Sequence, residues 1–179
     1  MYYNKSDKSV TESVDTLAGI VVKYCCSKDY SISTAESLTG GMISKFITSI
    51  PGASQIFELG VCSYSDRIKN KVLGVKNETL LKYTAVSKQT AEEMSKGIKD
   101  LSGSDIAVAV TGIAGPQGGT DENPVGTVYV SVRFKEECQT KNLALYKRYD
   151  DLCREDIRLL TTKEAFEMIL ELIKKAEVV

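Results

Sequence analysis

Apolar residues along the chain recur at two spacings, one typical of helices and one of strands, and the two kinds of segment alternate. A spacing of three and four residues predicts helices at 9–27, 42–49, 66–74, 77–83, 88–101 and from 154 to the end. Runs rich in β-branched and aromatic residues predict strands at 30–35, 57–65, 105–112, 125–134 and 138–149. Helices between strands imply an α/β fold in which helices cover both faces of one sheet.

Two segments refine the predicted sheet. The run DIAVAVTG at 105–112 is apolar almost throughout, which is typical of a central strand buried on both faces. The last two strands are joined by the tight connection KEE, which predicts an antiparallel hairpin. The sheet is therefore expected to be mixed, with mostly parallel strands.

Capping residues mark several helix ends. The segment SVTE, from Ser9 to Glu12, fits a capping box, so the polar residues 1–8 before it are expected to fray. Ser87 can begin a later helix, and Gly74 can end another. The 179 residues show no repeat or linker and predict a single domain over 1–179.

Composition argues against several classes of protein. A net charge of −1 gives no electrostatic reason to expect binding to nucleic acid or to a membrane surface. The five cysteines form no C-x-x-C pair and histidine is absent, which argues against zinc and fits reduced thiols in the cytosol. The chain has no apolar core of a signal peptide and no apolar run near the roughly 20 residues of a membrane span. We therefore expect a cytoplasmic protein without a metal or cofactor.

Segments rich in glycine, serine and threonine follow three of the predicted strands. In open α/β sheets, ligands bind beyond the carboxyl ends of the strands. Ser37, Tyr64 and the loop at 112–124 are therefore expected along one rim of the sheet. This rim is the first indication of a functional site.

The segment TAESLTGG at 34–41 places Ser37 at a strand-to-helix turn. The hydroxyl of such a serine projects above the sheet, and the free N–H groups of the next helical turn can hold an anion. Gly40 and Gly41 would let a ligand approach the backbone closely. The simpler interpretation makes Ser37 or Thr39 a helix N-cap. The spacing matches neither a P-loop nor the G-x-S-x-G nucleophile elbow.

If Ser37 is a nucleophile, histidine cannot accept its proton, because the chain has none. Lys69 and Lys71 lie just beyond the second strand, a few residues after Tyr64. A lysine base needs its pKa lowered from about 10.4 toward 7–8, by burial or by a nearby positive charge. Arg67 or a cationic substrate could supply that charge. The alternative is that both lysines are solvated surface residues.

The loop TGIAGPQGGTDENPVGTV, at 111–128, begins at the end of the buried strand. It holds five glycines and two prolines. Long loops in compact domains are usually functional or disordered. Glycines expose backbone N–H groups that suit an oxyanion hole or a phosphate cradle. A mobile hairpin tip is the alternative interpretation.

Four segments together resemble a known family. TAESLTGG, IPGASQIFELGVCSYSDRIKNKVLGV, AVSKQTAEEMSKG and VTGIAGPQGGTDENPVGTVYVSV are similar, in this order, to the C-terminal domain of the competence/damage-inducible protein CinA, a family that includes nicotinamide-nucleotide amidases. The resemblance is continuous from about Ser31 to Val132 and weaker toward the end, and Thr84 stands where the family usually has glycine. It implies a three-layer α/β/α fold. It also implies hydrolysis of nicotinamide mononucleotide to nicotinate mononucleotide and ammonia.

The resemblance also implies roles for individual residues. The serine of the E-S-x-T-G-G motif, here Ser37, matches the proposed nucleophile of the family, and Tyr64 and Lys69 match its proposed helpers. The late arginine segment of the family appears here as LCREDIR, which keeps Arg154 and Arg158 but lacks a glycine. The residues expected to bind substrate are Thr39, Gly40, Gly41, Thr111, Gly112, Ala114, Gly115, Gly118, Gly119, Arg154 and Arg158.

Other functions are compatible with the sequence. The domain could be a catalytically silent module that senses a nucleotide, or that docks onto a partner linked to competence or DNA damage. It could also be an amidase for another small carboxamide. The expected ligand is nicotinamide mononucleotide, the expected assembly is a homo-oligomer, and neither nucleic acid nor a membrane is expected as a partner.

Overall fold

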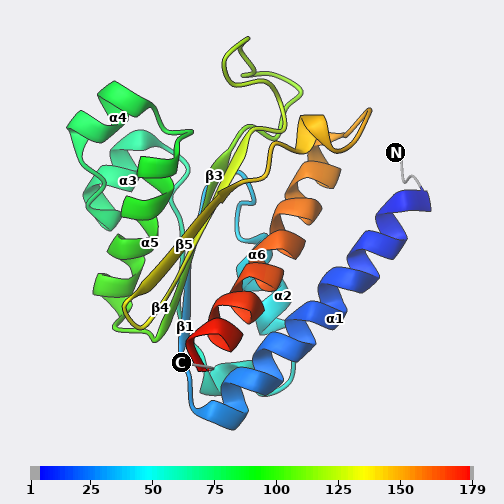
Figure 1. The fold of residues 1–179 in the computed structure, drawn as a ribbon, viewed down its shortest axis with the longest axis vertical. Coiled ribbons are helices and arrows are strands. Elements are labelled where there is room, and N and C mark those ends of the chain that lie inside the picture. Colours follow the sequence, from blue (N-terminus) through cyan, green and yellow to red (C-terminus); the bar gives the residue numbers. More distant parts are fainter. Residues whose placement is uncertain (1–4, 178–179) are drawn as a thin grey trace.

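The computed structural model describes residues 5–177, with side chains described from residue 9 onward, and shows a central sheet between two groups of helices (Figure 1). Residues 1–4, which belong to the segment expected to fray, lie outside the described residues. The strands are β1 (Ile32–Glu36), β2 (Phe57–Cys62), β3 (Ile106–Gly112), β4 (Val128–Phe134) and β5 (Glu137–Asn142). The helices are α1 (Lys5–Lys28), α2 (Met42–Thr48), α3 (Asp66–Leu73), α4 (Asn77–Tyr83), α5 (Lys88–Ser102) and α6 (Arg154–Glu177).

The sheet is mixed, as the sequence predicts. Its strand order is β2-β1-β3-β4-β5. β1 pairs in parallel with β2 and β3, whereas β4 pairs antiparallel with β3 and β5. β4 and β5 form the predicted hairpin. Because β1, β2 and β3 run in the same direction, their carboxyl ends share one edge of the sheet.

β3 lies at the centre of the sheet, and both of its faces are buried. Ile106, Val108 and Val110 belong to a large apolar cluster that includes residues of α1, α2 and α6. Ala107 and Ala109 face the other way and pack with residues of α3 and α5. Each large apolar side chain buried in this way stabilises the fold by roughly 1.5–3 kcal/mol. The arrangement confirms the predicted three-layer α/β/α sandwich.

Two of the three predicted helix ends are confirmed and one is wrong. The Ser87 hydroxyl accepts the amide of Thr90 at the start of α5, and Gly74 ends α3 in a left-handed conformation. α1, however, begins at Lys5, so Ser9 lies inside the helix. A capping box is a local pattern, and the same residue types are compatible with a helix that has already begun.

The last predicted strand is shorter than expected. β5 ends at Asn142 instead of continuing to residue 149. Leu143 and Leu145 are buried in the apolar cluster, and Ala144 between them has a left-handed φ of 42° that leads into a 3-10 turn. The alternation of apolar residues in this segment therefore arises from a turn whose side chains enter the core. In the sequence, this pattern looks the same as that of a strand.

The packing of α5 against the end of α3 predicts a destabilising substitution. A Cβ at Gly97 in α5 would lie 1.8 Å from the backbone oxygen of Leu73 in α3. Gly97→Ala is therefore expected to lower the free energy of unfolding by about 1–3 kcal/mol, since overpacking outweighs the better helix propensity of alanine. Gly19→Ala in α1 is the control, because no atom lies within 4 Å of its Cβ position. Urea denaturation of both variants measures the difference, and equal stabilities would contradict this close approach.

Candidate active site

The rim predicted from the sequence brings three strand ends together. In the sheet, Glu36 of β1 lies beside Cys62 of β2 and Val110 of β3. The next residue of each connection continues this register: the Ser37 amide donates to the Val110 carbonyl at 3.1 Å, and the Ser63 amide donates to the Glu36 carbonyl at 2.8 Å. The residues after β1 and β2 are thus held at the same level.

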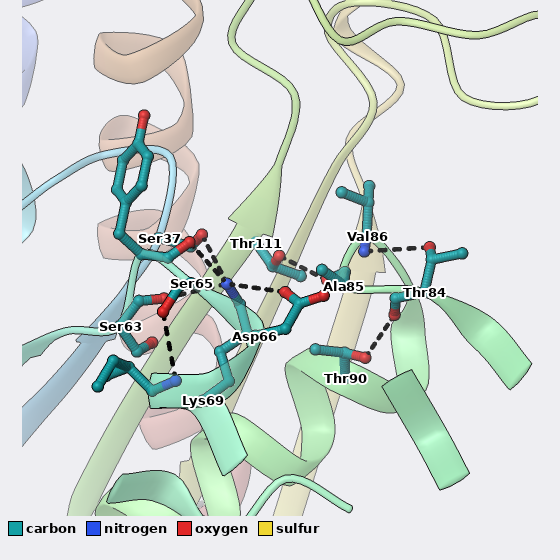
Figure 2. A network of polar contacts seen from close by, with 12 residues as sticks. Ser37, Ser63, Ser65, Asp66, Lys69, Thr84, Ala85, Val86, Thr90 and Thr111 are labelled. Atoms are coloured by element: carbon teal, nitrogen blue, oxygen red, sulfur yellow. Dashed lines mark hydrogen bonds and ion pairs between the residues drawn. The ribbon is translucent and has the colours of Figure 1, made fainter. Parts of the chain in front are cut away.

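Ser37 and Lys69 meet at this rim (Figure 2). The Lys69 ammonium, from α3, lies 3.2 Å from the Ser37 hydroxyl. Lys69 is 1% exposed and Ser37 is 8% exposed. Ser65 caps the start of α3, where its hydroxyl accepts the Ile68 amide, so the helix begins at Asp66 as predicted. The preceding strand, predicted up to Ser65, already ends at Cys62. This short helix aims Lys69 back toward the sheet.

Burial is the main influence on Lys69. Because an ammonium loses hydration when buried, the pKa of Lys69 is lowered from its ordinary value, and the Asp66 carboxylate partly opposes this effect. The Asp66 oxygen lies 3.9 Å from the Lys69 nitrogen. The ammonium also donates to the backbone carbonyls of Ser63, at 3.0 Å, and Tyr64, at 3.4 Å. Lys71, the other candidate base, is exposed.

The Tyr64 hydroxyl does not join this pair. Tyr64 is 65% exposed, and its hydroxyl accepts a hydrogen bond from the Arg154 guanidinium at 3.0 Å. Arg154 also donates to the carbonyl of Gly115 at 2.8 Å. The three residues that match the family's proposed catalytic groups thus line one cavity, but the Tyr64 hydroxyl makes no hydrogen bond to Ser37 or Lys69. Its side chain lines the same cavity but is held by α6 and the glycine-rich loop.

A cavity of about 250 Å³ opens beside Ser37. Its walls come from the ends of β1 and β3, from α3, from the segment before α5, and from the loop after β3. It is lined by Ser37, Leu38, Tyr64, Asp66, Lys69, Ala85, Val86, Thr111, Gly112, Ile113, Ala114, Gly115, Gln117, Gly118 and Arg154. Most of the predicted loop residues therefore face one cavity, together with both residues of the Ser–Lys pair.

Some of the predicted substrate-binding residues lie outside this cavity. Gly119 packs against Val125, where a Cβ would lie 2.9 Å from the backbone nitrogen. Arg158 donates to the Thr39 carbonyl at 2.8 Å and forms an ion pair with Glu155. Thr39 itself is fully buried. These residues support the walls of the cavity but do not line it.

The start of α2 is not a free anion site, in contrast to the sequence prediction. The buried Glu36 carboxylate accepts the amides of Gly41, Ile43 and Ser44 at 2.9–3.1 Å, and the Ser44 hydroxyl at 2.7 Å. Gly40 and Gly41 serve the turn itself, since their φ angles are 60° and 95°. The sequence signal for this role is a glutamate at the end of β1, shortly before the start of α2, and the sequence prediction did not include it.

Two groups of backbone amides remain available near Ser37. The amides of Leu38 and Thr39 donate no hydrogen bond within the described chain. The same holds, among residues 5–177, for the amides of Ala114, Gly115 and Gly118 in the loop. Unpaired amides beside a cavity can donate hydrogen bonds to an oxyanion or a phosphate oxygen.

A residue with an uncommon conformation directly precedes Ala85 and Val86, which line the cavity. Thr84, at the position where glycine is usual in the resembling family, has a φ of 64°, which β-branched residues rarely adopt. Its carbonyl accepts the Thr90 hydroxyl at 2.8 Å. The next carbonyl, that of Ala85, accepts the Thr111 hydroxyl at 2.7 Å. These bonds connect the wall to both α5 and the end of β3 (Figure 2).

Fold and site together define a three-layer α/β domain with a buried serine–lysine pair at the carboxyl edge of its sheet. The chain belongs to the CinA C-terminal domain family, whose model matches residues 14–173. It is 44% identical over 161 residues to a competence-damage inducible protein of Acetivibrio thermocellus. The aligned region covers 90% of this chain and 38% of that protein. The chain thus spans about two fifths of the length of such relatives.

Solved structures agree with this assignment. Competence/damage inducible protein CihA from Agrobacterium tumefaciens superposes with a TM-score of 0.85 and is 38% identical, over 89% of this chain and 95% of that one. Competence damage-inducible protein A from Klebsiella pneumoniae gives a TM-score of 0.84 at 32% identity, over 90% and 97% of the two chains. No helix within residues 5–177 is long and apolar enough to cross a membrane.

Proposed function

We propose that this domain is an amidohydrolase that converts nicotinamide mononucleotide to nicotinate mononucleotide and ammonia. The observation that carries the proposal is the buried Lys69 amine, 3.2 Å from the Ser37 hydroxyl inside a cavity. A serine needs an adjacent base to become a nucleophile, and a desolvated lysine can serve as that base. The resemblance to nicotinamide-nucleotide amidases supports the choice of substrate.

The reaction follows from this pair. Lys69, in its neutral form, accepts the Ser37 proton while the serine oxygen bonds to the amide carbon. The tetrahedral intermediate then collapses, the carbon–nitrogen bond breaks, and the Lys69 ammonium gives its proton to the departing nitrogen, which leaves as ammonia. Water hydrolyses the resulting ester with Lys69 again as base, which releases the carboxylate and restores Ser37. Each proton taken up by Lys69 is returned, so the cycle closes.

The developing oxyanion needs hydrogen-bond donors in the same cavity. The free amide of Leu38 directly follows the nucleophile, and those of Ala114 and Gly115 belong to the loop that lines the cavity. Preorganised donors of this kind are worth about 3–4 kcal/mol each in the transition state. The Gly41 amide is excluded from this role because it donates to Glu36.

Ammonia release from nicotinamide mononucleotide tests the proposed function directly. The purified protein is incubated with the nucleotide, with and without EDTA, and ammonia and nicotinate mononucleotide are measured. Equal release in both samples supports the Ser–Lys reaction. Activity that EDTA abolishes and a divalent ion restores contradicts it, because a metal-activated water would then be the attacking group. No release from the nucleotide under either condition would favour a binding module.

Arg154 is the candidate ligand for the substrate phosphate. It lines the cavity, and its guanidinium already binds two oxygen acceptors, the Tyr64 hydroxyl and the Gly115 carbonyl. Arg154→Ala is expected to raise KM for nicotinamide mononucleotide about 10- to 100-fold, since charge-assisted contacts contribute about 1.5–3 kcal/mol. KM for nicotinamide riboside, which has the same ring and no phosphate, is expected to change little.

Arg158→Ala is the matched control for this prediction. Its guanidinium donates to the Thr39 carbonyl outside the cavity, so the variant is expected to change KM for both substrates to the same degree. If Arg154→Ala also weakens both substrates equally, Arg154 does not bind the phosphate. The loop amides of Ala114, Gly115 and Gly118 would then be the remaining ligands.

A further inference from the structure

One charged residue in the cavity is not used by the reaction described above. Asp66 lies in the first turn of α3, and its carboxylate is 3.9 Å from the Lys69 nitrogen. Its side chain is 58% exposed and lines the cavity. In Figure 2 it lies on the opposite side of the Lys69 nitrogen from Ser37.

The charges of the residues that line the cavity make Asp66 a site that can distinguish cationic from uncharged ligands. Of the lining residues, all within the described chain, Asp66 alone carries a carboxylate, while Lys69 and Arg154 carry basic groups. When Lys69 is neutral, as the reaction requires, Asp66 has no cation beside it in this part of the cavity. A positively charged ring bound beside Ser37 would fill that place, whereas an uncharged ring would not.

We propose that Asp66 is a specificity residue that favours amides attached to a cationic ring over the same amides on a neutral ring. This inference rests on the proposed function, since it concerns the ring whose amide reaches Ser37. The carboxylate attracts the ring cation. The ring cation in turn favours neutral Lys69, because two positive charges repel each other across the short distance within the cavity.

Asp66 also affects the protonation of Lys69, and this effect opposes that of the bound ring cation. In the free protein, the Asp66 carboxylate favours the charged form of Lys69, while burial of the amine favours the neutral form. The other charged group that lines the cavity is the Arg154 guanidinium. The other polar groups that face the Lys69 amine are the carbonyls of Ser63 and Tyr64 and the Ser37 hydroxyl. Removing the Asp66 charge is therefore expected to shift the acid limb of the pH profile of kcat/KM toward lower pH.

Binding of two nucleotides that differ only in ring charge tests the proposal. Nicotinamide mononucleotide has a cationic ring, and its dihydro form has a neutral ring with the same amide, ribose and phosphate. Calorimetry gives Kd for both in Ser37→Ala, which cannot turn them over, and in Ser37→Ala combined with Asp66→Asn. The preference for the cationic form is expected to fall about 5-fold in the double variant, as for a partly exposed charge pair. Asp66→Glu is expected to retain part of the preference.

Glu78→Gln is the matched control, because Glu78 lies in the first turn of α4 and outside the cavity. It removes a carboxylate from an equivalent helix position and is expected to leave the preference unchanged. An unchanged preference in the Asp66→Asn variant overturns the role of Asp66 while ammonia release still supports the proposed reaction. A preference that depends on Asp66 without ammonia release supports Asp66 and overturns the reaction. If neither nucleotide binds, both proposals fail.

Discussion

Replacement of Ser37 by alanine is expected to lower kcat for ammonia release by about 10⁴-fold or more. In hydrolases with an activated serine, removal of the nucleophile leaves only the catalysis that donors and binding supply. Ser37 is the hydroxyl that the buried Lys69 amine contacts. KM is expected to change little, because the alanine variant retains the cavity and its charges. Initial rates and a thermal unfolding curve, measured on the same preparation, separate loss of chemistry from loss of structure.

Ser63→Ala is the control that matches this substitution. Ser63 is also a fully buried serine at the rim, and its hydroxyl has no hydrogen-bond partner among the described residues. The variant keeps the backbone carbonyl that Lys69 contacts, so most of the activity is expected to remain. If Ser63→Ala is inactive and Ser37→Ala is active, the nucleophile has been assigned to the wrong serine.

The fold could be predicted from the sequence because its signals are local. The apolar run of β3, the capping hydroxyl of Ser87 and the terminal Gly74 each determine a feature within a few residues of themselves. Errors occurred where a local pattern fits two structures. The alternation around Leu143 and Leu145 reads as a strand, yet it arises from a turn whose side chains enter the core.

The site could be predicted only in part, because its contacts join distant segments. The position of Ser37 after a parallel strand predicts its place at the rim, and the spacing offers Lys69 and Lys71 as partners. The resemblance to the family selects Lys69 between them. The contact between Tyr64 and Arg154 joins residues 90 positions apart, and no pattern in the sequence near either residue predicts it. The role of Glu36 could not be predicted for another reason. A buried carboxylate requires surrounding hydrogen-bond donors, and these are known only once the fold is known.

Lys69 is expected to be needed for the reaction but not for folding. Lys69→Met, which keeps a long side chain without the amine, is expected to lower kcat about 10²- to 10⁴-fold, the usual contribution of a general base. Lys69→Arg is expected to be equally inactive, because a guanidinium stays protonated and cannot accept the Ser37 proton. Lys71→Met, two residues along α3 and exposed, is the control and is expected to keep full activity.

The pH dependence of stability gives an independent test of the Lys69 environment. Burial lowers the pKa of Lys69 below its ordinary value of 10.5, so between the lowered pKa and 10.5 the unfolded chain binds more protons than the folded protein. The unfavourable effect of the buried charge on stability is therefore complete below the lowered pKa and disappears as pH rises to about 10.5. Lys69→Met lacks this charge at every pH. Relative to the variant, the wild-type protein is thus expected to gain stability as pH rises through this window.

Urea denaturation of wild type and Lys69→Met at several pH values between 6 and about 10.5 measures this difference, and kcat/KM over the same range reports the neutral fraction of Lys69. Activity of the wild type is expected to rise with pH and to level off below 10.5, in the window where the stability difference changes. If the stability difference is independent of pH and activity still rises near 10.5, the Lys69 amine is not shifted. A lysine with its ordinary pKa would be almost fully protonated near neutrality and could not serve as the base for Ser37 there.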